Sequence, residues 1–335
     1  MIARKTSLLD RVGRSEIISF LVVAASLVVP LTTTNAGIVS LFTQIMIGLM
    51  AALSVYIMLR MDLMTFAVPA FMAIGGYSAA IFGVRLDVTN VVALTLLTLL
   101  IPMLLALPIG LLVLRLRGVY FVLVTFVIAE IMPLLLFETP GLTGGSNGIA
   151  GLPAVEFFGI SIEDNNKILL MTIVLTLLAM LITIGVTRFY RHQFASIREN
   201  EVLAQSLGLV VWRYKVIGFC VAAGVAGLAG FCLVEMLITA HPSSFQAITS
   251  VNYVAYVVVG GQSMLLGTVV GSTLLVWATN LFSYQGEYSQ ALFGVLLMIS
   301  VLFAKTGIVG LIQSLFVRTQ KRKQDSVAQS RGAKS

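Results

Sequence analysis

The chain has 335 residues, of which 59% are hydrophobic and 10% are charged, against roughly a quarter charged in an average soluble domain. A soluble protein of this composition would lack a polar surface, and the apolar residues suffice for about ten helices of ~20 residues. We therefore predict an all-α fold, a polytopic transmembrane helical bundle. A transmembrane barrel is excluded because its strands alternate apolar and polar residues, whereas apolar residues here run on for twenty or more positions. The net charge of +7 follows membrane topology and does not indicate nucleic-acid binding.

Stretches without charge define the predicted spans, and Glu130 is the one acid predicted inside a span. Two stretches are too long for a single crossing and contain breaks at 32–37 and 260–263, so each counts as two. The count is about ten spans, with eight possible, and the weakest, 248–262, is short enough to be re-entrant. The stretches are 17–59, 63–84, 88–114, 118–137, 168–187, 216–234, 236–286 and 288–304.

The distribution of Lys and Arg predicts the orientation. With the N-terminus in the cytoplasm, 19 of the 21 basic residues fall in inside segments, and only Arg85 and Lys167 fall outside. This asymmetry follows the positive-inside rule and, with an even number of spans, places both termini in the cytoplasm. The predicted parts are a cytoplasmic segment 1–16, a transmembrane domain 17–317 and a basic cytoplasmic tail 318–335. The domain includes an extracytoplasmic loop, 138–167, and a cytoplasmic loop, 188–215.

The cytoplasmic loop predicts one amphipathic helix of ~12 residues. Ser196 is suited to cap its start and Gly208 to end it. One alternative is a helix that rests on lipid headgroups. Its acid pair favours docking to a protein instead, because membrane-surface helices are typically rich in Lys and Arg. The predicted apolar face holds Ile197, Ala204 and Leu207, and the charges that point elsewhere are Arg198, Glu199 and Glu201.

Motifs for nucleotide and metal chemistry are missing from the sequence. It contains no Gly-Lys dipeptide, so the phosphate-binding loop G-x-x-x-x-G-K-[ST] is absent and ATP would have to be hydrolysed by a partner. Neither His192 nor His241 has a Cys or carboxylate at ligand spacing. We therefore predict no metal site and no cofactor, and a protein that is not itself an enzyme.

An ordered series of motifs resembles the branched-chain amino acid ABC permeases of the LivM type. In the cytoplasmic loop, Ile-Arg-Glu-Asn-Glu at 197–201 is followed by Gly208 and then by Tyr214-Lys215. The resemblance extends over roughly residues 40–312. Its other blocks are Arg-Leu-Arg-Gly-Val-Tyr-Phe at 115–121, Leu-Thr-Gly-Gly-Ser-Asn-Gly-Ile at 142–149, Ala-Gly-Leu-Ala-Gly at 226–230, Pro-Ser-Ser-Phe at 242–245, Gly-Gly at 260–261 and Gly-Thr-Val-Val-Gly at 267–271.

The resemblance implies a permease subunit in the bacterial inner membrane that forms half of a translocation pathway. It implies a heterodimer with a homologous permease, two cytoplasmic ATP-binding subunits and an extracytoplasmic solute-binding protein. ATP-driven closure of the ATPases would push on residues 196–208. The residues expected to couple to the ATPases are Ile197, Arg198, Glu199, Glu201, Ala204 and Gly208.

A second set of residues is expected to line the pathway or a helix interface. Gly224, Gly227 and Gly230 recur every third residue, and close helix packing alone would explain them. Glu130 is expected either to face a cavity or partner, or to lie at the membrane interface near one helix end. The candidates are Phe71, Gly75, Gly76, Tyr77, Glu130, Thr143, Gly144, Gly145, Asn147, Gly227, Gly230, Gly260 and Gly261.

The sequence departs from the family pattern at two places, and other functions remain open. Val68 stands where the family often has His or Gln, and Pro133 stands where the family motif Glu-Ile-x-Arg often has its Arg, three residues after the acid equivalent to Glu130. The solute is accordingly less certain than the fold, and urea, an amide or a sugar are alternatives to an amino acid. A stand-alone secondary transporter or channel is a rival of another class, weakened by the shortage of intramembrane acids. A membrane-embedded enzyme is a third alternative, weakened by the missing catalytic groups.

Overall fold

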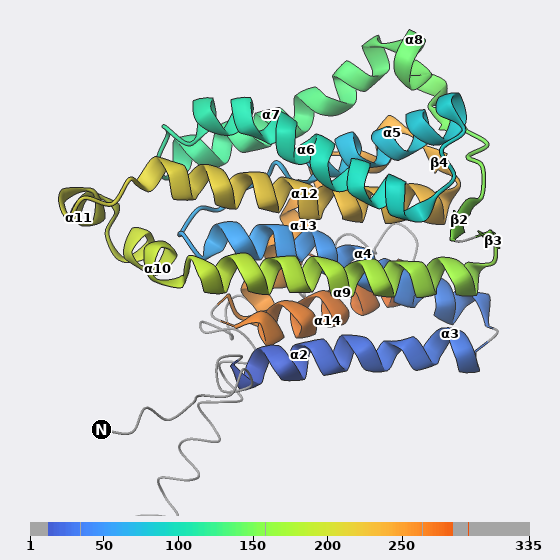
Figure 1. Cartoon of the computed structure of the whole chain (residues 1–335), viewed down its shortest axis with the longest axis horizontal. Coiled ribbons are helices and arrows are strands. Elements are labelled where there is room, and N and C mark those ends of the chain that lie inside the picture. The colour runs from blue at the N-terminus through green and yellow to red at the C-terminus, as the bar shows by residue number, and fades with distance from the viewer. Residues whose placement is uncertain (1–12, 34, 158, 263, 284–293, 295–335) are drawn as a thin grey trace, which may run out of the picture.

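The computed structural model describes residues 13–33, 35–157, 159–262, 264–283 and 294. These residues form a bundle of helices that run roughly parallel or antiparallel to one another, with short β-ladders at one end (Figure 1). The helices are α2 (Arg14–Ala25), η1 (Ser26–Val28), α3 (Val29–Thr32), α4 (Ala36–Leu59), α5 (Val68–Leu86), α6 (Val91–Val113), α7 (Val119–Glu138), α8 (Pro140–Thr143), η2 (Gly145–Asn147), α9 (Asn165–Phe189), α10 (Arg191–Glu199), α11 (Glu201–Ser206), α12 (Val211–Leu237), η3 (Pro242–Phe245), α13 (Thr249–Gly260) and α14 (Leu265–Ser283). The strands are β1 (Ile149–Ala150), β2 (Val155–Phe157), β3 (Ile160–Ile162) and β4 (Thr239–Ala240).

Seven described helical segments are long and apolar enough to cross a membrane, which confirms a polytopic helical bundle. The first crosses as Ser15–Thr32, a continuous run of α2, η1 and α3. The other six are α4, α5, α6, α7, α9 and α12. They correspond in order to the first seven predicted spans. The bundle is all-α apart from the four short strands, which the sequence did not predict.

The predicted span 248–262 is not a full crossing. Its helix, α13, has 12 residues and so rises ~18 Å, whereas a bilayer core is ~30 Å thick. It packs against α14, and a Cβ on Gly260 would overlap the carbonyl group of Gly267. The two helices therefore form a tight hairpin in which α13 is too short to cross on its own. The predicted span 288–304 lies outside the described residues, apart from residue 294, as do residues 1–12 and the tail 318–335.

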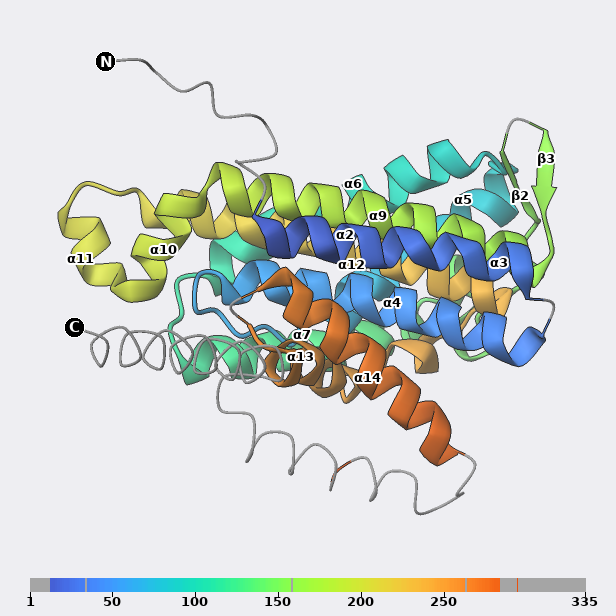
Figure 2. The same ribbon diagram turned by 90° about the horizontal axis from the view of Figure 1, so that it is seen from below.

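The centre of the bundle is α12, which packs against α5, α6, α4 and α9 (Figures 1 and 2). Small residues make this possible, because a Cβ on Gly75 of α5 would overlap the backbone of Gly227. On the next turn of α12, a Cβ on Gly230 would overlap the carbonyl oxygen of Met72. The backbones of α5 and α12 thus touch, the geometry that small residues allow in lipid.

The bundle has two distinct ends (Figure 1). One end, here called the α11 end, carries α10, α11 and the turn between α6 and α7. The other, the hairpin end, carries α8, the β2–β3 ladder and the β1–β4 ladder, in which Ile149 pairs with Ala240. The described loops predicted inside therefore share one end and those predicted outside share the other. The side of the membrane that each end faces stays a prediction.

Candidate functional site

The cytoplasmic loop forms two helices, not the single helix that the sequence predicted. The break is at Asn200, whose backbone is extended and whose Oδ1 accepts a hydrogen bond from the Leu203 N–H at 3.0 Å. Asn200 is therefore the N-cap of α11. Ser196, predicted as the cap, lies inside α10, and its hydroxyl donates to the His192 carbonyl oxygen.

Gly208 ends α11, as the sequence predicted. Its φ of +90° lies in the region that favours glycine. The Gly208 N–H donates to the Gln205 carbonyl, and the Leu209 N–H donates to the Ala204 carbonyl at 3.0 Å. These two bonds form a Schellman motif, which satisfies carbonyls that the helix end would leave unpaired.

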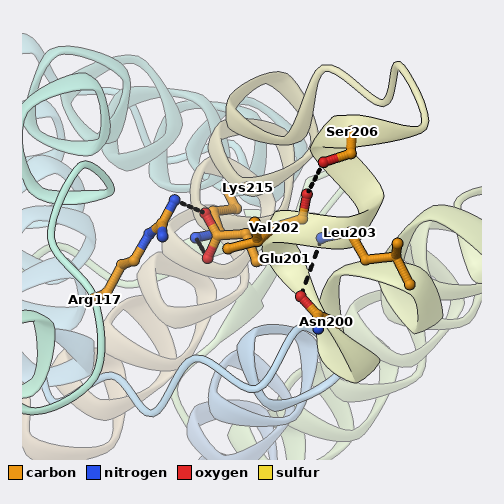
Figure 3. A network of polar contacts seen from close by, with 7 residues as sticks. All are labelled: Arg117, Asn200, Glu201, Val202, Leu203, Ser206 and Lys215. Atoms are coloured by element: carbon orange, nitrogen blue, oxygen red, sulfur yellow. Dashed lines mark hydrogen bonds and ion pairs between the residues drawn. The ribbon is translucent and has the colours of Figure 1, made fainter.

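Glu201 does not point freely into solvent but ties α11 to the bundle (Figure 3). Its Oε2 accepts a hydrogen bond from Lys215 Nζ at 2.8 Å, and its Oε1 lies 3.4 Å from Arg117 Nη2. The Lys215 side chain is only 2% exposed, so its ammonium depends on this carboxylate for compensation. Glu201 points away from the apolar face as expected but is only 23% exposed, and the sequence did not show that α12 brings Lys215 next to it.

The opposite side of α11 exposes apolar side chains. In Figure 3 the Leu203 side chain extends away from the ion pairs. Ile197 and Ala204 are buried, as predicted, but Leu207 is 79% exposed and not on the buried face. Arg198 and Glu199 are exposed at the end of α10. The exposed face, which we call the α11 face, consists of Val202, Leu203 and Leu207, each more than half exposed.

The candidates on α5 and α12 come together at a packed crossing. Gly75 and Gly76 meet Gly227 and Gly230 of α12 without room for a side chain. This geometry agrees with the interpretation that the glycines of α12 serve close helix packing. Around the crossing, Phe71 makes an edge-to-face contact with Phe219, with centroids 5.4 Å apart, and the buried Tyr77 lies near Phe245.

The glycine-rich loop at 143–147 is ordered and tied to η3 at the hairpin end. Thr143 Oγ1 lies 2.6 Å from the Leu136 carbonyl oxygen, and Gly144 and Gly145 both have positive φ. Asn147 is exposed. His241, which the sequence analysis left without a role, contacts the Ser146 carbonyl oxygen through Nε2 at 2.9 Å. Only the structure shows this link, because 95 residues separate the partners.

The remaining candidates do not join this loop. Gly261, with φ +117°, makes the turn between α13 and α14, where Gly260 contacts Gly267. Glu130 is exposed on α7, and within the described residues no hydrogen bond or ion pair reaches it. It lies eight residues before Glu138, the last residue of α7, and so ~12 Å inside the helix end.

Glu235 also lies inside a spanning helix, contrary to the sequence prediction. Glu235 was assigned to a break between spans, but α12 extends over 27 residues to Leu237 and includes it. Its residue surface is 7% exposed, and it lines a cavity of about 140 Å³ together with Glu163 and Pro153. No group of three or more His, Cys, Asp or Glu suited to a metal ion occurs among the described residues.

Comparison with known proteins identifies the family. Residues 37–303 match the model of the family described as branched-chain amino acid transport system / permease component. The high-affinity branched-chain amino acid transport system permease proteins LivM of Salmonella typhimurium and Escherichia coli are each 28% identical over 221 residues, 59% of this chain and 52% of theirs.

A more distant relative is a sugar permease. The ribose import permease protein RbsC of Bacillus subtilis is 28% identical over 141 residues, 39% of this chain and 43% of its own. The chain thus spans about half the length of the curated relatives it matches. No solved structure matches. With four-fifths of its length inside the family model, the chain belongs to the branched-chain amino acid transport system permease family, a family of ABC-type, multi-pass inner-membrane transport subunits.

Proposed function

We propose that this chain is the permease subunit of an ABC importer and forms half of the pathway for branched-chain or similar small amino acids. Its partners are a homologous permease, two cytoplasmic ATP-binding subunits and an extracytoplasmic solute-binding protein. Family membership and the LivM relatives support the solute class. The ribose permease relative makes a sugar the second candidate.

The observation that carries the proposal is the two-sided construction of α11. One side is fixed to the bundle through Glu201, and the other presents the α11 face at the extreme end of the molecule. A lipid-resting helix would place its apolar side chains toward the bilayer, whereas Figure 1 shows α11 beyond the ends of the spanning helices. An exposed apolar face at this place is suited to a protein partner.

The ion pairs of Glu201 define how a push on α11 would reach the membrane helices. Lys215 belongs to α12, the central helix, and Arg117 lies two residues before α7. A movement of α11 caused by ATPase closure would therefore displace two spanning helices together. Rigid-body shifts of this kind convert a local contact into a change of access.

The exposed face of α7 is the surface that we assign to the partner permease. Glu130 lies in its middle, flanked by exposed Val127 and Leu134. An ionised carboxylate facing lipid costs about 3 kcal/mol or more, so this face is more stable when covered by protein or by a hydrated pathway. Glu130 then lies between the two permeases.

Co-purification of the ATPase subunits tests the docking role. Replacing Val202, Leu203 and Leu207 together by Ser should abolish co-purification while the permease remains folded, because these side chains are already exposed. The matched control is Ile160→Ser at the hairpin end, also exposed, which should leave co-purification unchanged. Full retention of the ATPases by the triple variant would contradict the proposal.

Orientation and solute need separate tests. In a background without Cys220 and Cys232, a cysteine at the exposed Ser146 should react with an impermeant thiol reagent in intact cells. A cysteine at Ser196 should react only after permeabilisation, and the reverse pattern would overturn the proposed orientation.

Uptake into vesicles tests the solute. Vesicles that hold the complete complex and its binding protein should take up labelled leucine when ATP is added. Uptake of ribose or urea without uptake of leucine would contradict the proposed amino acid solute.

A further inference from the structure

A cavity opens at the α11 end between the end of α6 and the start of α12. Its volume is about 440 Å³, within the ~300–1,000 Å³ typical of small-ligand sites. The proposed function assigns it no role. Its wall combines the basic side chains Arg115, Arg117 and Lys215 with the apolar Leu111, Leu114 and Trp212.

The charge of the cavity favours an anion. Three cationic side chains line it against a single carboxylate, that of Glu201. Glu201 binds Arg117 and Lys215, whereas Arg115 is exposed and makes no hydrogen bond or ion pair with any described residue. Val211 and Trp212, the first two residues of α12, also line the cavity, so the positive end of a 27-residue helix faces the same space.

The apolar part of the wall continues along the membrane face of α6. Leu111 follows Leu107 and Leu104 at helical spacing, and all three are exposed. Trp212 is also exposed and lies in the first turn of the spanning helix α12, and aromatic side chains are enriched near the ends of membrane helices. A ligand with an anionic head and apolar chains would therefore contact both surfaces at once.

We propose that this cavity binds the phosphate group of an anionic phospholipid, with the acyl chains lying along α6. Arg115 supplies the guanidinium that has no partner within the described residues, and Arg117, which lines the same cavity and pairs with Glu201, supplies a second. Guanidinium groups match phosphate oxygens through paired hydrogen bonds. Free phosphate would use the same basic groups but would leave the apolar face of α6 uncovered, so the lipid is the favoured source.

Trp212 is a native reporter of occupancy, since the chain has only one other tryptophan, Trp277. The full chain carrying Trp277→Phe is reconstituted in phosphatidylcholine vesicles that contain either brominated phosphatidylglycerol or brominated phosphatidylcholine. Bromine quenches Trp212 only when the lipid lies beside it. We expect phosphatidylglycerol to quench at a several-fold lower mole fraction than phosphatidylcholine.

Charge variants separate this site from general attraction to a basic protein. Arg115→Gln should reduce the preference for phosphatidylglycerol about tenfold, because it removes a charge-assisted hydrogen bond to the phosphate that general surface attraction does not supply. Arg191→Gln removes the same charge from exposed α10, outside the cavity, and should leave the preference unchanged. Arg117→Gln is a second variant that should also reduce it.

The results distinguish a bound anionic phospholipid from a bound soluble anion. Equal quenching by the two lipids, or equal preference in wild type and Arg115→Gln, would overturn the proposal. Saturable binding of inorganic phosphate to the detergent-purified chain by calorimetry, combined with equal quenching by the two lipids, would overturn it in favour of a soluble anion. These results are independent of ATPase docking, because the purified chain alone is measured.

Discussion

Two regions of the molecule are held together in opposite ways. One is the crossing of α5 with α12, and the other is the α11 end. At the crossing, glycines let two backbones touch, with no charge involved. At the α11 end, a buried Lys215 depends on Glu201, and apart from the buried Ala204 the other residues of α11 are exposed. The crossing therefore determines how the bundle packs, whereas the pair of Glu201 and Lys215 attaches the exposed α11 face to it.

The largest effect should come from filling the crossing. In Gly230→Val, the new side chain would overlap the Met72 carbonyl, which is backbone and cannot rotate away. We expect destabilisation of about 3 kcal/mol or more and loss of monodisperse protein in size-exclusion chromatography. Gly185→Val on α9, where a Cβ meets nothing within 4 Å, is the control and should remain monodisperse. Equal behaviour of both variants would show that the crossing is not closely packed.

Removing the anchor of α11 should be the next largest change. Glu201→Ala leaves the Lys215 ammonium buried without its carboxylate, at a cost of about 3 kcal/mol. The thermal unfolding temperature in detergent should fall, and adding Lys215→Met should restore most of it. A double variant as unstable as the single one would mean that the ion pair is not the cause.

A smaller effect is expected at the end of α11. Gly208→Ala places a Cβ at φ +90°, a strain of about 1 kcal/mol, although no atom lies within 4 Å of it. Amide hydrogen exchange in 201–209 should become faster, while exchange in α12 stays unchanged. The control Gly185→Ala adds the same atom within α9 and should not make exchange in 201–209 faster. If exchange in 201–209 were equally fast in both variants, backbone strain at Gly208 could not be the cause of the faster exchange.

Local sequence patterns predicted the bundle and the first seven crossings, because each crossing requires its own long apolar run. Gly208 was predictable for the same reason, since helix termination depends on nearby residues. Asn200 is a strong N-cap residue, and giving it weight over Ser196 would have revealed the break between α10 and α11.

The long-range features could not be predicted. Glu201 and Lys215 lie on different helices, so their meeting depends on how α11 folds back onto α12. Glu235 looked like a break between spans because a charge interrupts the apolar run, whereas the structure buries it within α12, where it lines a cavity with residues 152–154 and Ile168 of α9. Such contacts depend on tertiary structure and leave no periodic signal in the sequence.

The central proposal is that the two sides of the cytoplasmic loop serve different purposes: Glu201 anchors the loop to the bundle, and we propose that the exposed α11 face and the neighbouring exposed Glu199 meet the ATPase. The most direct test is solute-stimulated ATP hydrolysis by the reconstituted complex carrying Glu199→Lys. We predict that stimulation is lost while the unfolding temperature of the permease is unchanged, because Glu199 is exposed and surface charges contribute little to folding. Full stimulation in this variant, with the ATPase still co-purifying, would contradict the claim.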